Sequence, residues 1–140
     1  MDQTDYHRYI KAFNARDYAT LETFFADDFA LENAGFIVKG KQQFRDFYQF
    51  FHHYCRETVH FKQFFPGKDA FVTNVVIRFE GLNDLSPQLL AEKGFSGMTP
   101  VPRGATVDVE FLILYQLNPQ GLIQHIKGAV WIPAARAVEA

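Results

Sequence analysis

Residues 9–17, YIKAFNARD, decide the fold of this chain together with FFADD (24–28) and LEN (31–33). Apolar side chains recur here at the helical spacing i, i+3, i+4 and i+7, on Tyr6, Tyr9, Ile10 and Phe13. Asp17 then offers an N-cap for a second helix. The order predicts an amphipathic helix, a tight break, a second short helix and a turn into a strand.

Capping and turn residues predict where these elements end. Thr4 is expected to cap the first helix, with Asp5 favourable in its first turn. The second helix is expected to run to residues 26–28 and to give way to a short strand over residues 29–32. Residues 35–40, which begin and end with glycine, are expected to form a loop.

The hydrophobic period changes after a third helix, which is expected over residues 41–55. Alternating apolar side chains predict strands in three places: residues 70–80, 107–117 and 122–131. The tetrapeptide NPQG (118–121) predicts a turn between the last two. A helical first part followed by long paired strands is typical of an α+β protein. Residues 81–104 are interpreted as a lid or as a long connection.

Composition limits the class of protein. The chain has 140 residues and is expected to form one domain, residues 1–140. Its 16 phenylalanines predict an interior that is very aromatic or partly hollow. The formal net charge of -2 gives no basic field for phosphates, so we expect no nucleic-acid partner.

The expected compartment is the cytoplasm. Cys55 is the one cysteine in the sequence, which excludes a disulfide within the chain and suits a reducing environment. Residues 1–5 lack the basic start and apolar run of a signal peptide. No apolar run is long enough to span a bilayer, so we also expect no membrane partner.

The three stretches that decide the fold resemble, in order and chemistry, the N-terminal half of the nuclear transport factor 2-like superfamily. That superfamily includes ketosteroid isomerase and the SnoaL-like polyketide cyclases. The resemblance covers nearly the whole chain and is best over residues 9–48 and 111–131. It implies a cone-shaped α+β barrel of the cystatin-like kind, in which three N-terminal helices pack on a strongly curved, mostly antiparallel sheet with an open apolar mouth.

The resemblance also shows which isomerase groups are missing. Setting Arg8-Tyr9 against the tyrosine in the first helix of the isomerase places its base aspartate at Asn33. The NPQG turn places its oxyanion-hole acid at Ile113. Because an amide cannot take up a proton at neutral pH and an isoleucine cannot donate a hydrogen bond, we do not expect the steroid isomerase reaction.

The same comparison, with the strand period of two, predicts the lining of a pocket. Tyr9 and Asn33 are the candidate catalytic residues, as a hydroxyl donor and an amide that orients a ligand. Each also has a structural interpretation, as a core tyrosine and as a turn residue. The expected ligand-binding residues are Phe13, Phe47, Tyr48, Phe51, Thr73, Val75, Ile77, Phe79, Phe111, Ile113, Tyr115, Ile126, Gly128 and Val130. A register shifted by one residue would turn His125 and Lys127 into the pocket instead.

Other polar clusters give weaker signals. His52, His53 and Cys55 are not spaced as metal ligands on a helix, so no metal site is expected. Glu57 and His60 fit a base and its partner in a cleft, or residues at the start of a strand. No phosphate-binding or dinucleotide-binding motif occurs, and no cofactor is expected.

The predicted function is binding of a small apolar compound, aromatic or polycyclic, in a SnoaL-like pocket. Isomerisation, cyclisation and hydration are open as reactions, and whether the protein is an enzyme is left undecided. The alternative is a noncatalytic dimerisation or ligand-carrying module. The resemblance further implies a homodimer that pairs through the outer face of the sheet.

Overall fold

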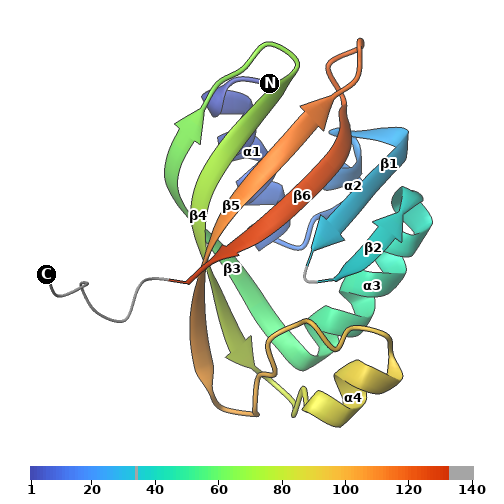
Figure 1. The fold of residues 1–140 in the computed structure, drawn as a ribbon, viewed down its shortest axis with the longest axis vertical. Helices are drawn as coiled ribbons and strands as arrows, with labels where there is room; N and C mark the ends of the chain where they lie inside the picture. Colours follow the sequence, from blue (N-terminus) through green and yellow to red (C-terminus); the bar gives the residue numbers. More distant parts are fainter. Residues whose placement is uncertain (34, 133–140) are drawn as a thin grey trace, which may run out of the picture.

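The chain folds into a curved sheet wrapped around helices, and the computed structural model describes residues 1–33 and 35–132 (Figure 1). The elements are α1 (Gln3–Asn14), α2 (Tyr18–Glu22), β1 (Phe25–Asn33), β2 (Phe36–Lys39), α3 (Gly40–Tyr54), β3 (Cys55–Phe65), β4 (Ala70–Gly81), α4 (Pro87–Glu92), β5 (Thr106–Leu117) and β6 (Ile123–Trp131). The six strands lie in the order β2-β1-β6-β5-β4-β3. Only β1 and β6 pair in parallel, so the predicted α+β cone with a mostly antiparallel sheet is confirmed.

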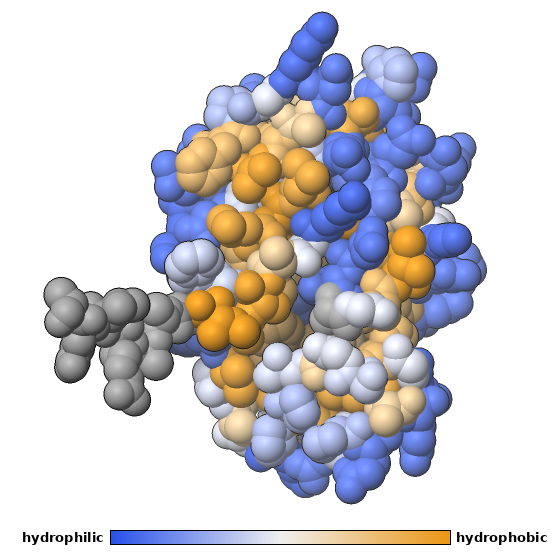
Figure 2. All heavy atoms as spheres, viewed as in Figure 1, coloured by the Kyte–Doolittle hydropathy of each residue, from blue (hydrophilic) through white to orange (hydrophobic). Residues whose placement is uncertain are grey.

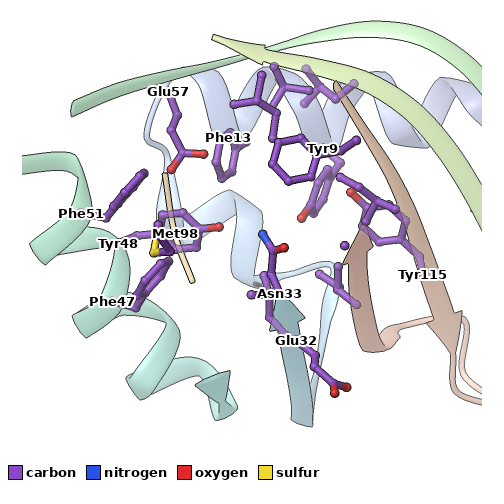
Figure 3. A pocket seen from close by; sticks show the side chains of 18 of the residues that line it. Tyr9, Phe13, Glu32, Asn33, Phe47, Tyr48, Phe51, Glu57, Met98 and Tyr115 are labelled. Atoms are coloured by element: carbon purple, nitrogen blue, oxygen red, sulfur yellow. The ribbon is translucent and has the colours of Figure 1, made fainter. Parts of the chain in front are cut away.

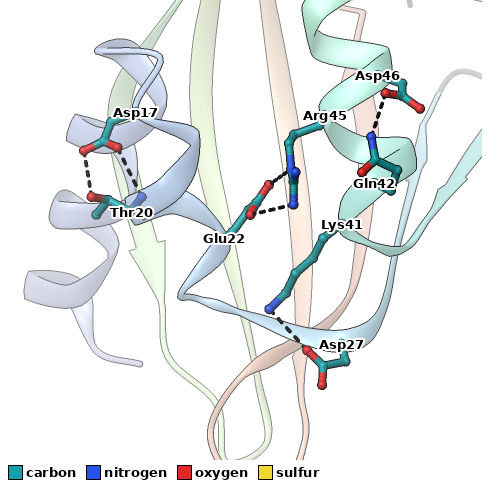
Figure 4. Close-up of polar contacts among 8 residues, drawn as sticks. All are labelled: Asp17, Thr20, Glu22, Asp27, Lys41, Gln42, Arg45 and Asp46. Carbon is teal, nitrogen blue, oxygen red and sulfur yellow. Dashed lines mark hydrogen bonds and ion pairs between the residues drawn. The ribbon is translucent and has the colours of Figure 1, made fainter.

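Asp2, and not Thr4, caps α1. Its side chain accepts a hydrogen bond of 2.8 Å from the Asp5 amide, and the Asp5 carboxylate accepts one of 3.1 Å from the Asp2 amide. This reciprocal pair satisfies two amides that the helix itself leaves unbonded. At α2 the predicted cap is confirmed, since the Asp17 side chain accepts from the Thr20 amide at 3.1 Å (Figure 4).

The helix expected up to residue 28 ends earlier, at Glu22. Residues 25–33 form β1 because this segment pairs with β6, with Phe25 opposite Ile123. The rings of Phe25 and Phe29 stack 4.2 Å apart inside the sheet. Ion pairs then hold this part of the chain to α3: Glu22 with Arg45 and Asp27 with Lys41 (Figure 4).

Two strands were not predicted. Residues 36–39, expected as a loop, form the short edge strand β2 on β1. Residues 55–65 form β3, which begins directly after α3 and pairs with β4 at the other edge of the sheet.

The remaining predictions for the second half hold. Strands β4, β5 and β6 lie where alternation predicted them. The Asn118 side chain orders the turn between β5 and β6 by accepting hydrogen bonds from the Gln120 and Leu122 amides. Residues 81–104 contain α4, and none of the described helices is long and apolar enough to cross a membrane.

Candidate functional site

A cavity of about 90 Å³ lies inside the cone, between α1, α3 and the inner face of the sheet (Figure 3). Ten of the 21 residues that border it are aromatic. The residues that border it are Tyr6, Tyr9, Ile10, Phe13, Leu31, Glu32, Asn33, Phe36, Phe47, Tyr48, Phe51, Glu57, Val59, Ile77, Phe79, Met98, Phe111, Ile113, Tyr115, Ile126 and Gly128.

The structure places most of the expected site residues around this cavity, Tyr9 and Asn33 included. Three expected ligand contacts do not border it. Thr73 and Val75 are fully buried in β4 behind the cavity wall, and Thr73 is bonded to Tyr6. Val130 has the inward parity, but its side chain is 45% exposed because β6 here extends past the closed part of the cone.

A cluster of hydroxyl groups joins α1 to the sheet at one side of the cavity. The Tyr6 hydroxyl lies 3.0 Å from Thr73 Oγ1 and 3.0 Å from the Tyr115 hydroxyl. Burial raises the pKa of Tyr9 and Tyr115. These groups therefore stay protonated at neutral pH and can donate hydrogen bonds.

Asn33 projects its amide into the cavity from the end of β1 (Figure 3). Gly128, opposite on β6, leaves the room for it: a Cβ there would lie 3.3 Å from both Cγ and Oδ1 of Asn33. The amide of Asn33 makes no side-chain hydrogen bond with the other described residues. It is thus available to a ligand as donor and as acceptor.

Glu57 is the acid that the sequence comparison with the isomerase did not supply. It lies on the inner face of β3, is 7% exposed and borders the cavity. His52 Nε2 lies 3.1 Å from Glu57 Oε1, and His52 Nδ1 lies 2.5 Å from the Tyr18 hydroxyl. A carboxylate can only accept, so His52 Nε2–H donates to Glu57.

The sequence left Glu57 and His60 open, as a base and its partner in a cleft or as residues at the start of a strand, and the structure does not bring the two side chains together. His60 is exposed on the opposite face of β3, since residues three apart in a strand point to opposite sides. The sequence signal that could have identified His52 as the partner of Glu57 was the end of the third helix. His52 lies in the last turn of α3, and the chain enters β3 at Cys55, which brings Glu57 back beside it.

The second acid at the cavity, Glu32, points away from the interior. It lies on the outer face of β1, where its Oε2 is 3.0 Å from His125 Nε2. His125 and Lys127 therefore face outward, and Ile126 faces the cavity. The register shift that would have turned His125 and Lys127 inward does not occur.

Residues 93–105 contribute to the mouth of the cavity. Met98 borders the cavity directly. The ring of Phe95 packs against those of Phe36 and Phe47, with centroids 5.0 Å apart in both pairs. On the outside, a surface hollow of about 430 Å³ shares Asn33, Phe36 and Gly128 with the cavity.

The described residues contain no group of three or more His, Cys, Asp or Glu side chains placed to hold a metal. Cys55 is completely buried, and burial together with the charge of Glu57 raises the pKa of its thiol. A thiol that stays protonated is a poor nucleophile. The chemistry of the site therefore rests on hydroxyl groups, one amide and one carboxylate.

Comparisons with known proteins agree with this fold. The family profile described as "SnoaL-like domain" matches residues 6–126. No curated protein matches the chain. Among solved structures, a nuclear transport factor 2-like protein of unknown function from Burkholderia pseudomallei K96243 has a TM-score of 0.71 at 12% identity, with 93% of this chain and 92% of that chain covered.

Two further structures are similar. A candidate polyketide cyclase from Silicibacter sp. TM1040 has a TM-score of 0.72 at 21% identity, covering 90% of this chain and 85% of that one. A Mycobacterium tuberculosis protein in complex with estradiol-17β-hemisuccinate has a TM-score of 0.64 at 23% identity, covering 86% and 85%. At these identities the likeness establishes the fold. Because the family profile spans most of the sequence, the chain belongs to the SnoaL-like domain family of the nuclear transport factor 2-like superfamily.

Proposed function

We propose that this protein binds a small apolar molecule with at least one aromatic ring in the cavity of its cone. The observation that carries the proposal is a largely aromatic and aliphatic wall interrupted by a few polar groups that make no side-chain hydrogen bond with the other described residues. Asn33 and Tyr48 each present such a group, and burial and the charge of Glu57 raise the pKa of Tyr48, so its hydroxyl remains a donor. Ligand pockets in proteins generally have this composition.

Cavity volume limits the ligand. An empty cavity of roughly 150 Å³ holds a benzene molecule, so about 90 Å³ accepts one ring only with small side-chain movements. A polycyclic ligand would place one ring inside and the rest in the outer hollow beside Asn33, or would displace Met98. The complex of the M. tuberculosis relative with a steroid derivative supports the larger ligand class.

An isomerase, cyclase or hydratase reaction on such a ligand is the catalytic form of this proposal. The noncatalytic alternative, a ligand-carrying or dimerisation module, agrees with the apolar residue Ile113 at the position of the isomerase acid. The two forms differ in whether a bound compound is chemically changed. The expected cytoplasmic location rests on the single cysteine and stays a prediction.

A homodimer through the outer face of the sheet is the second part of the proposal. Figure 2 shows this face, on which apolar side chains gather across the strands. Leu112 is 40% exposed and Trp131 54% exposed there. We expect sedimentation velocity at micromolar concentration to give a dimer and Leu112→Glu to give a monomer. A wild-type monomer would contradict the pairing.

Native mass spectrometry of freshly purified protein, compared with its denatured mass, tests ligand binding. The protein is measured as purified and after addition of compounds with one to four fused rings. Ile113→Phe, which fills the cavity, should lose the bound mass. Leu112→Phe is the matched control, because the neighbouring residue on β5 faces outward. The absence of any bound compound in wild type would contradict ligand binding and favour the noncatalytic dimerisation module.

A further inference from the structure

One oxygen of the Glu57 carboxylate faces the cavity. Oε1 accepts the hydrogen bond from His52, and no described residue donates to Oε2. No fully enclosed side-chain oxygen or nitrogen among the described residues lacks a partner. Oε2 is therefore not fully enclosed by protein atoms. Since Glu57 is only 7% exposed and borders the cavity, a bound ligand can reach this oxygen from inside the cavity.

The hydrogen bonds around Glu57 fix the direction of that oxygen. His52 is 5% exposed and donates from α3, while the half-buried Tyr18 on α2 holds the other ring nitrogen. The hydroxyls of Tyr9 and Tyr48 and the thiol of Cys55 lie around the carboxylate, and the charge of Arg16 acts on Cys55 and Tyr18. Among the described residues no lysine or arginine forms an ion pair with Glu57.

We infer that Glu57 is the proton acceptor of this pocket, with His52 and Tyr18 as positioning residues. The inference rests on the proposed ligand-binding function and adds the chemical step to it. A carboxylate with one oxygen held by a histidine and the other facing an apolar cavity is arranged for general-base catalysis. The ligand class is a carbon acid, such as a ring with a C–H next to a carbonyl.

The step transfers one proton and no other atom. Glu57 Oε2 takes the proton from the C–H group, and the electron pair of that bond moves into the ligand to form an enolate. Tyrosine hydroxyls and the Asn33 amide in the same cavity can donate to the enolate oxygen. Return of the proton from Glu57 to another carbon completes an isomerisation and leaves the carboxylate ionised.

The base is tested with 5-nitrobenzisoxazole, a compact aromatic carbon acid. Removal of its C–H proton breaks the ring N–O bond and gives a nitrile and a coloured phenolate, while the proton passes through Glu57 to water. We expect wild type to accelerate this elimination and Glu57→Gln to lose at least about 100-fold of the rate. Glu110→Gln is the matched control, because its carboxylate bonds Lys62 and Asn74 and does not border the cavity, and it should keep the wild-type rate.

The role of His52 is tested by two substitutions at the same site. His52→Gln keeps an N–H that can reach Glu57. It should retain more activity than His52→Phe, which keeps an aromatic ring but has no N–H to donate. Equal losses at equal stability would overturn the positioning role.

Binding and base catalysis are separated by measuring the intact probe on Glu57→Gln, again by native mass spectrometry. If Glu57→Gln binds the probe and wild type converts the probe no faster than Glu57→Gln does, Glu57 is not the base and the binding function stands. If neither protein binds the probe, both the inference and binding of compact two-ring ligands are overturned.

Discussion

The hydroxyl oxygens of Tyr6 and Tyr115 lie 3.0 Å apart and join α1 to β5 inside the cone. Tyr6 also bonds Thr73, so its hydroxyl links two strands at once, and it is 1% exposed. Tyr9, one turn further along α1, borders the cavity with the same chemical group. Tyr6 borders the cavity too, but two hydrogen bonds hold its hydroxyl, whereas the Tyr9 hydroxyl makes none with the described residues and is the one we expect a ligand to contact.

We predict that Tyr6→Phe lowers the free energy of unfolding by about 1–3 kcal/mol, because Thr73 and Tyr115 lose a buried partner. Tyr9→Phe should lower it by less than about 1 kcal/mol and should weaken ligand binding instead. Urea unfolding of both variants measures the difference. A larger loss for Tyr9→Phe than for Tyr6→Phe would show that the roles are reversed.

His52→Phe is predicted to destabilise the fold by about 3–5 kcal/mol, because it leaves the Glu57 carboxylate buried without its donor. Glu57→Gln should cost less, since the amide oxygen can still accept from His52. Replacing both residues, as His52→Phe with Glu57→Leu, should recover part of the loss. Equal effects of the two single substitutions in thermal unfolding would contradict a charged Glu57 in the folded state.

Gly128→Ala should reduce ligand affinity with little effect on stability. The added Cβ would lie 3.3 Å from Asn33 Cγ, so the amide must move by a few tenths of an ångström away from its present position. Ala129→Gly, one residue along on the exposed face, is the control for backbone effects. Unchanged affinity in Gly128→Ala would mean that Asn33 does not contact the ligand.

Stability is predicted to fall above about pH 10, the usual pKa of tyrosine. Burial raises the pKa of Tyr6, Tyr9, Tyr48 and Tyr115 in the folded state. Below pH 10 both states are protonated and these groups cause no pH dependence; above it the unfolded chain loses protons that the folded chain keeps. Each buried tyrosine then lowers the free energy of unfolding by about 1.4 kcal/mol per pH unit.

Urea unfolding between about pH 8 and 11 measures this slope. Tyr48→Phe removes one of the four tyrosine hydroxyls. The fall of the free energy of unfolding with pH should then be smaller by about 1.4 kcal/mol per pH unit. A stability that stays constant over the range would show that these hydroxyls ionise equally in both states.

Periodicity predicted the parts of the fold in which one face is buried and the other exposed. The stripe on α1 and the alternation in β4 and β5 have this property, and all three elements form where expected. Edge strands carry a weaker signal because fewer neighbours cover them. β2 has four residues, and β3 mixes exposed and half-buried positions along much of its length, so neither was predicted.

The contact between Glu57 and His52, the central feature of the candidate site, could not be predicted from the sequence for a different reason. Glu57 meets His52 only because α3 ends at Tyr54 and the chain reverses into β3 at once. Because β3 was not predicted, neither the inward orientation of Glu57 nor its contact with His52 could be derived. Ile113 and Asn33, in contrast, were placed by the resemblance to the isomerase, aligned on the NPQG turn and on Arg8-Tyr9, and both border the cavity.

The most direct test of ligand binding in the cavity is a nuclear magnetic resonance titration of the isotope-labelled protein with 4-hydroxyacetophenone, a one-ring compound with a donor and an acceptor. Binding inside the cone predicts saturable shifts for the Asn33 side-chain amide and the backbone amides of Ile113 and Gly128. The outward residues Leu112 and Trp131 should shift much less. No shifts, or shifts confined to the outer face, would contradict a ligand site inside the cone.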